Sequence, residues 1–226
     1  MQQSTLPTPD SLFAPENFLR YVRPYLQEEM QMDDLLVRKE ALLQEDLDGF
    51  NLYQGIFSRC TFTNCSFANA TFVDVLFKNC DLSNSVFTDT SFERCRFVNC
   101  RCVGADFDGS VFRRVDADQT TFQYACFDRA KMTNIEFTGC NFTDASIEET
   151  KLKNFSARDC QFVHTCFFKT PLTGIDFSEN TLSALTLSAP PTELKGCTVN
   201  LTQAAELATL LGVTVKDVSA ENHTNI

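Results

Sequence analysis

The sequence of 226 residues contains no tryptophan, only two histidines and only eight glycines. No glycine-rich loop of the phosphate-binding type is present, and the two histidines, His164 and His223, belong to no hydrolase or metalloprotease motif. His164 lies near Cys166, but no catalytic motif includes either residue, which disfavours a catalytic pair. These absences predict a protein that is not an enzyme and that binds no cofactor and no metal ion.

Long apolar runs are missing as well. No stretch approaches the 20 or so apolar residues that a membrane-spanning helix needs. The first ten residues lack the basic and apolar regions of a secretory signal. We therefore expect no membrane association, a cytoplasmic location and reduced thiols for the 11 cysteines.

Negative charge is in excess, with a formal net charge of −11, but it is unevenly distributed. The first 49 residues contain ten acids and four bases, whereas residues 50–190 contain sixteen acids and thirteen bases. An acidic chain has little electrostatic attraction for nucleic acid. We therefore expect a protein partner and no direct binding of nucleic acid.

Phenylalanine is present in excess, with 22 residues. From Leu47 to Leu187 every fifth residue is apolar, through 29 positions of which 17 are Phe. The position two residues earlier holds small side chains such as Cys, Ala, Ser and Thr. Neither a helix nor a flat strand has a period of five residues. The repeat predicts an all-β solenoid, a coil with corners whose large side chains fill the interior and whose small ones pack beside them.

This pattern resembles the bacterial pentapeptide-repeat family, whose consensus is A(D/N)LXX with Phe often at the central position. The resemblance implies a right-handed quadrilateral β-helix with four pentapeptides in each coil. It predicts about seven coils over residues 40–190. Residues 1–39 would form an N-terminal extension and helical cap, and residues 191–226 a C-terminal cap with a helix, a short strand and a tail.

The open ends of a solenoid need caps. Near the N-terminus, Pro15 suits a first helical position and Pro24 should break that helix, which predicts two short helices. This segment is either a cap or a docking arm for a partner. Near the C-terminus we expect a helix with Thr202 as N-cap, an end at Gly212 and a strand at 213–215.

The segment GCTVNLTQAAELATLLGVTV, residues 196–215, resembles the C-terminal cap of quinolone-resistance proteins of the Qnr and MfpA types. In the Qnr type the terminal helix forms a two-fold dimer interface, so the resemblance implies a homodimer. The alternative is that the same side chains only seal the last coil and the chain is a monomer. The interface residues implied are Leu207, Leu210, Leu211, Val213 and Val215.

Five cysteines recur at multiples of 20 residues and should form one column inside the solenoid, interrupted by Thr120. No CxxC motif is present, and thiols that point into apolar surroundings behave as small inert hydrophobic groups. We therefore interpret the column as packing rather than as a zinc site or a redox switch. Its members are Cys60, Cys80, Cys100, Cys140 and Cys160.

Residues 20 apart should share a face, which sorts the charges into an acidic face beside a basic one. Two functions are consistent with such a rod. The first is a non-catalytic scaffold that binds a partner protein through its charged faces. The second, implied by the resemblance, is a DNA mimic that binds DNA gyrase or topoisomerase IV and protects it from quinolones. The acidic face comprises Asp89, Asp106, Asp108, Asp128, Glu148 and Glu149, and the basic face comprises Arg94, Arg113, Arg114, Lys131, Lys151 and Lys153.

Overall fold

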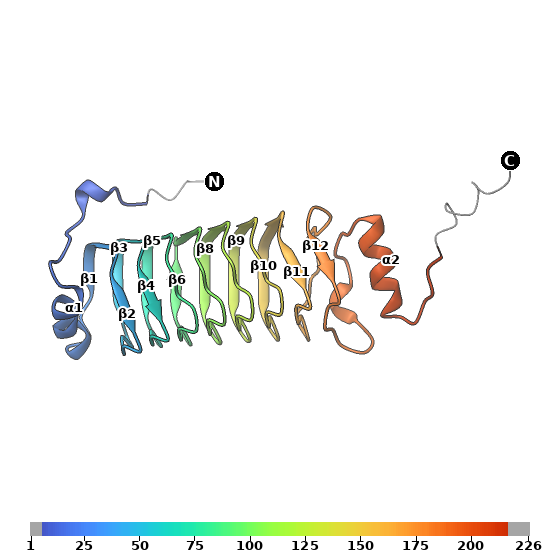
Figure 1. Ribbon diagram of the computed structural model, residues 1–226. Helices are drawn as coiled ribbons and strands as arrows, with labels where there is room; N and C mark the ends of the chain where they lie inside the picture. Colours follow the sequence, from blue (N-terminus) through green and yellow to red (C-terminus); the bar gives the residue numbers. More distant parts are fainter. Residues whose placement is uncertain (1–5, 217–226) are drawn as a thin grey trace.

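The computed structural model describes residues 6–216, which form a rod, a right-handed β-solenoid of about eight turns (Figure 1). Short parallel strands stack along the rod, with helix α1 at one end and helix α2 at the other. The predicted fold class is confirmed. No helix among these residues is long and apolar enough to cross a membrane.

Each turn takes 20 residues, because Met32 pairs with Leu52 and Leu52 with Phe72. The main sheet runs in the order β1-β3-β5-β6-β8-β9-β10, with β7 beside β6 between β5 and β8. Two smaller sheets pair β2 with β4 and β11 with β12. The strands are β1 Met32–Arg38, β2 Ala41–Leu43, β3 Asn51–Ser58, β4 Thr61–Thr63, β5 Thr71–Lys78, β6 Ser91–Glu93, β7 Arg96–Val98, β8 Val111–Asp118, β9 Lys131–Thr138, β10 Lys151–Arg158, β11 Gln161–Val163 and β12 Thr181–Ser183.

Four five-residue units make one turn, and most units turn a corner at a residue with positive φ. Asn64, Asn69 and Asp74, for example, have φ of 55°, 57° and 56°. Asn, Asp and Gly tolerate this left-handed conformation better than other residues do. The corner therefore explains why these residue types are frequent two positions after each large apolar residue.

The interior is a stack of phenylalanine rings. Phe87, Phe107 and Phe127 lie directly above one another, with ring centroids 5.1 and 4.9 Å apart and ring planes within 11°. Several small positions hold Ser or Thr, whose hydroxyl donates a hydrogen bond to the preceding layer: Ser110 Oγ lies 2.5 Å from the carbonyl oxygen of Phe87, and Thr150 Oγ1 lies 2.6 Å from that of Phe127. The small residues thus tie adjacent turns together as well as leaving room for the rings.

The solenoid begins at Met32, inside the segment that the sequence assigned to the N-terminal extension of residues 1–39. The reason is that the five-residue step continues backwards from Leu47 through Leu42 and Val37 to Met32, all of which are buried. This earlier start accounts for about eight turns where the repeat predicted about seven.

Two further N-terminal expectations are wrong. A single helix, α1 (Phe18–Gln27), contains Pro24 instead of ending there, and it starts after the N-cap Asn17 rather than at Pro15. A proline removes only one hydrogen bond of this short helix, and the buried Phe18 ring, centred 5.8 Å from that of Phe62, anchors the helix on the end of the core. A 3-10 helix, η1 (Pro9–Ser11), precedes it.

At the C-terminal end, η2 (Thr192–Leu194) and α2 (Leu201–Thr209) close the rod. Asn200, and not Thr202, is the N-cap of α2, in a capping box with Gln203. The chain turns at Gly212, with φ of 75°, as expected. The strand expected at 213–215 is absent from the described chain, because the backbone N–H of Val213 donates to the carbonyl of Ala208 in the helix-ending turn.

Candidate functional site

The five cysteines of the predicted column are buried and free, and all but Cys160 donate weakly through their thiols to backbone carbonyls of the preceding layer. Cys80 Sγ, for example, lies 3.4 Å from the carbonyl oxygen of Phe57. A side-chain hydrogen bond with Cys100, together with burial, raises the pKa of Cys80 to about 12. A thiol with such a pKa is almost entirely protonated near neutral pH, which makes it a poor nucleophile.

His164 lies apart from Cys166. Its Nδ1 is 3.3 Å from Asp144 Oδ1 at an exposed corner, while Cys166 Sγ donates to Glu148 Oε1 at 3.1 Å. Among residues 6–216, no group of three or more His, Cys, Asp or Glu side chains could hold a metal ion.

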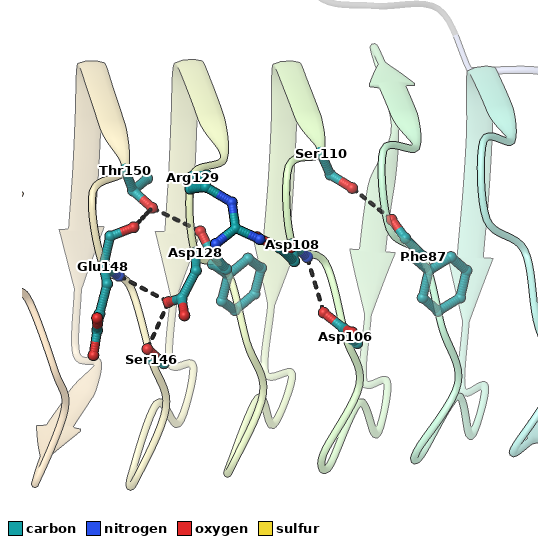
Figure 2. Close-up of polar contacts among 10 residues, drawn as sticks. Phe87, Asp106, Asp108, Ser110, Asp128, Arg129, Ser146, Glu148 and Thr150 are labelled. Carbon is teal, nitrogen blue, oxygen red and sulfur yellow. Dashed lines mark hydrogen bonds and ion pairs between the residues drawn. The ribbon is translucent and has the colours of Figure 1, made fainter.

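Four residues of the acidic face, Asp106, Asp108, Asp128 and Glu148, lie on consecutive turns (Figure 2). Asp89 and Glu149 occupy the same positive-φ corner position as Arg129 on other turns. Several of these carboxylates bind groups of the protein itself. Asp128 Oδ1 accepts from Ser146 Oγ at 2.5 Å and from the backbone N–H of Glu148 at 2.9 Å. Asp106 Oδ1 accepts from the backbone N–H of Asp108 at 3.0 Å. Asp128 therefore ties its turn to the next one, and Asp106 stabilises its own turn.

Two more acids of this face are paired with cations. Arg129 binds the Asp108 carboxylate (Figure 2), and Lys169 Nζ lies 2.8 Å from Glu149 Oε1. The hydrogen bond and positive charge of Lys169 lower the pKa of Glu149. With six acids and two cations, the formal charge of the face is −6 + 2 = −4. The face is thus acidic, but only two of its acids, Asp89 and Glu148, are neither paired with a cation nor bound to a backbone N–H group within the described residues.

Five residues of the basic face lie on β8, β9 and β10, and the sixth, Arg94, directly follows β6 and differs from the rest. Arg94 forms a bidentate contact with Asp74, at 2.7 Å for both bonds, and a further bond of 2.5 Å with Glu93. The hydrogen bonds to Asp74 raise the pKa of Arg94. Its charge is therefore neutralised by a residue one turn away, which the sequence pattern did not reveal.

The other five cations are exposed, and none has an ion pair within the described residues. Lys131 and Lys151 are direct partners in the ladder, and Thr133 separates Arg113 from Lys153. Like charges on directly opposed residues destabilise a sheet. Because no acid pairs with these five cations within the described residues, their positive charge is uncompensated. We call it the basic patch; its residues are Arg113, Arg114, Lys131, Lys151 and Lys153.

Two acids border the basic patch on the same sheet. Asp116 and Glu136 are direct ladder partners. Partial burial, followed by the negative charge of Glu136, raises the pKa of Asp116. The positive surface is therefore narrow, and a negative strip runs beside it.

The predicted dimer residues fall into two groups. Leu207 packs against the core of the solenoid. Leu210, Leu211, Val213 and Val215 are 45–65% exposed. Leu210 and Leu211 also line an open groove of about 540 Å³ with Leu185, Leu187 and residues 188–191.

Sequence reasoning missed a break in the main sheet after β10. The signal was present, since Phe155 occupies a small position that holds Val75, Cys95, Val115 and Ile135 in the earlier turns.

A coil of 20-residue turns with four five-residue faces and stacked Phe rings defines the class of pentapeptide-repeat solenoids. Residues 70–141 match the family model described as "Pentapeptide repeat region". No curated protein matches the chain.

Among solved structures, a trypsin-treated variant of QnrB1, a plasmid-mediated fluoroquinolone resistance protein, is 22% identical with a TM-score of 0.48, covering 83% of this chain and 91% of that one. HetL, a pentapeptide repeat protein involved in heterocyst differentiation regulation in the cyanobacterium Nostoc, is 14% identical with a TM-score of 0.30, covering 82% and 98%. A pentapeptide repeat protein from the Arabidopsis thaliana thylakoid lumen is 22% identical with a TM-score of 0.26, covering 75% and 90%. Similarity at this level transfers no partner to this chain.

Proposed function

We propose that this chain is a non-catalytic scaffold that binds a partner protein through its basic patch. The supporting observation is that most charged side chains of the acidic face are bound to other groups of the protein, whereas those of the basic patch are not. Four of the six acids on the acidic face are bound to cations or to the backbone, whereas the five cations of the basic patch have no such contacts among the described residues. Complementary charge of this kind steers and orients a partner.

Two matched double variants test this proposal, because each reverses two surface charges without touching the core. Lys131→Glu with Lys151→Glu should weaken binding of the partner about tenfold or more. Asp89→Lys with Glu148→Lys on the acidic face should change it little. The partner is captured with the wild-type rod, purified, and then titrated with all three proteins.

Equal loss in both variants, or loss only in the acidic-face variant, would contradict the proposal. Raising the salt concentration should weaken binding of the wild type and have less effect on the basic-patch variant, because screening acts on the charges that the variant has removed.

The alternative is a DNA mimic that binds DNA gyrase or topoisomerase IV. A mimic of DNA would need free negative charge along its length, and the engaged carboxylates of Asp106, Asp108, Asp128 and Glu149 argue against this. A supercoiling assay with purified gyrase, with and without ciprofloxacin, separates the two functions. We expect no inhibition and no protection at tens of micromolar protein; either effect would favour the alternative and make the acidic face the site to mutate.

We also propose that the exposed apolar side chains after α2 pack against a second copy of the chain. Leu210, Leu211, Val213 and Val215 form an apolar surface beside an open groove, and such surfaces often mark interfaces. Sedimentation equilibrium should give a dimer for the wild type and a monomer for Leu211→Glu. A monomeric wild type at all concentrations would leave these residues with a capping role only.

A further inference from the structure

The main sheet stops at β10, although the chain continues for another turn. β9 and β10 pair at seven positions, but no backbone hydrogen bond in the described chain joins β10 to residues 171–178, which lie one turn further on. On its other side, that segment bonds to the C-terminal cap, where the N–H of Leu172 lies 3.0 Å from the carbonyl of Glu193 and that of Phe177 lies 2.8 Å from that of Thr198. β10 is therefore an edge strand inside the rod.

The direction in which the unpaired backbone N–H groups of β10 point can be inferred from the hydrogen bonds of the other turns. At the position equivalent to Asn154, the backbone N–H of Arg94 donates to the carbonyl of Arg113 in the next turn at 2.9 Å. By the same register, the N–H groups of Leu152 and Asn154 point away from β9 toward the next turn, and neither has a backbone partner within residues 6–216. Such unpaired groups are a template for another strand.

The amino-acid sequence explains the break. On this turn the large and small side chains are exchanged, because Phe155 occupies a position that holds a smaller side chain in the earlier turns and Ala157 occupies a position that usually holds a large one. Pro171, one turn after Lys151, has no backbone N–H with which to continue the ladder. Three residues thus act together to separate residues 171–178 from β10.

The break leaves apolar surface partly open. The residues equivalent to Leu152 and Phe155 in the preceding turn, Met132 and Ile135, are each 2% exposed, whereas Leu152 and Phe155 are only half-buried. An added strand would cover both side chains and pair with the free backbone groups.

The charges around this edge select its partner. Lys151 and Lys153 stand on the edge strand itself, with Lys131 and Arg113 behind them. Antiparallel pairing of two β10 edges would bring lysines of two copies together, which disfavours a second copy. A long polyanion such as nucleic acid would meet Asp116 and Glu136 beside the patch. A short acidic polypeptide segment meets neither obstacle.

We propose that the open edge of β10 accepts an extended acidic segment of the partner protein as an added strand. The backbone of the segment pairs with Leu152 and Asn154, its alternate carboxylates lie beside Lys151 and Lys153, and its inward side chains cover Leu152 and Phe155. This is recognition by β-augmentation, in which the backbone supplies affinity and the side chains supply specificity. The proposal rests on the basic patch as the partner surface and adds the shape of what binds there.

The opposite edge of the same sheet does not offer this site. β1 is bridged by Phe13, whose N–H lies 2.7 Å from the carbonyl of Asp34 and whose carbonyl accepts from the N–H of Leu36 at 2.7 Å. Asp33 and Asp34 make its surroundings negative. An acidic strand is therefore directed to β10.

The test uses a fluorescent peptide of about nine alternating Glu and Val residues, long enough for one strand, and two N-methylated forms of it. One form carries N-methyl groups on the Glu residues and the other on the Val residues. In a strand, alternate N–H groups point to opposite edges, so only one form should lose binding, by about tenfold or more, while the other should bind like the parent peptide. Lys151→Glu with Lys153→Glu should weaken binding of the parent peptide by a similar factor.

Amide hydrogen exchange of the full chain provides the second readout. The amides of Leu152 and Asn154 should exchange quickly in the free protein and become protected when the parent peptide binds. Protection in the free protein, or equal binding of both methylated forms, would overturn the edge proposal. If both forms bind equally and binding is still lost with the lysine variant, the basic patch stands as a partner surface and only strand addition fails. Tighter binding of a short DNA duplex than of the peptide would overturn the choice of an acidic polypeptide.

Discussion

Replacing Phe107 with alanine should lower the free energy of unfolding by about 3–5 kcal/mol, the usual cost of removing a fully buried aromatic side chain. Phe107 is fully buried and lies between Phe87 and Phe127, with centroids 5.1 and 4.9 Å away. Its neighbours are held by the ladder of backbone hydrogen bonds on each turn, so they cannot collapse into the cavity. Chemical denaturation followed by far-UV circular dichroism measures the loss.

Tyr124→Ala is the matched control, because it also removes an aromatic ring from the middle of the rod. Tyr124 is 62% exposed, and surface substitutions usually change stability by less than about 0.5 kcal/mol. Similar losses for the two variants would show that the central ring stack does not carry the stability of this region.

Replacing Glu193 with alanine should destabilise the chain by about 3 kcal/mol, because it leaves buried donors without an acceptor. Glu193 is 3% exposed, and its Oε1 accepts from the N–H of Lys169 at 2.8 Å, from the N–H of Ser188 at 3.1 Å and from the Ser188 hydroxyl. On the preceding turn, the N–H of Glu149 donates to the carbonyl of Phe168. The Glu193 carboxylate thus replaces the carbonyl of a turn that does not follow.

The effect of Glu193 should depend on pH. Burial acts to raise the pKa of Glu193, but the Ser188 hydroxyl and the backbone N–H groups together lower it by more, so the pKa lies below its ordinary value. A carboxyl group whose pKa is lower in the folded state stabilises the fold above its unfolded pKa, near 4.3 for Glu. This stabilisation is lost as the pH falls through the folded value.

Denaturation of the wild type and of Glu193→Gln at several pH values checks this sign. The wild type should be more stable at pH 7, and the difference should shrink as the pH falls below about 4. A constant difference across this range would mean that the charge of Glu193 has no part in closing the rod. Glu206→Ala serves as the control for Glu193→Ala, since Glu206 bonds to Ser183 and Ala184 at an exposed position.

The caps illustrate where local sequence signals were insufficient. Thr202 was a reasonable N-cap by residue type, but Asn200 takes that place because its amide nitrogen also donates to the carbonyl of Ser178 in the last turn, at 2.9 Å. Pro24 should end a helix on local grounds, yet α1 continues through Tyr25 and Leu26, which pack against the core. In both cases tertiary contacts outweighed a local preference.

The amino-acid sequence by itself determined the solenoid, its 20-residue turn and the division of side chains into inward and outward ones. A period of five sustained over the repeat can be satisfied only by a coil that returns the same positions to the interior. It also placed the charges on their faces, because residues 20 apart must share one.

Only the tertiary structure decided which of those charges are free. Arg94 is neutralised by Asp74 and Asp108 is bound by Arg129, whereas Lys131 and Lys151 lie side by side without an acid. Ion pairing depends on side-chain directions across neighbouring turns, which the repeat leaves open. The same holds for the edge of β10. Phe155 and Pro171 each depart only slightly from the repeat, but they lie on adjacent turns, and there the hydrogen bonds between β10 and residues 171–178 are missing. A strand pairs only with a backbone that lies within hydrogen-bonding distance.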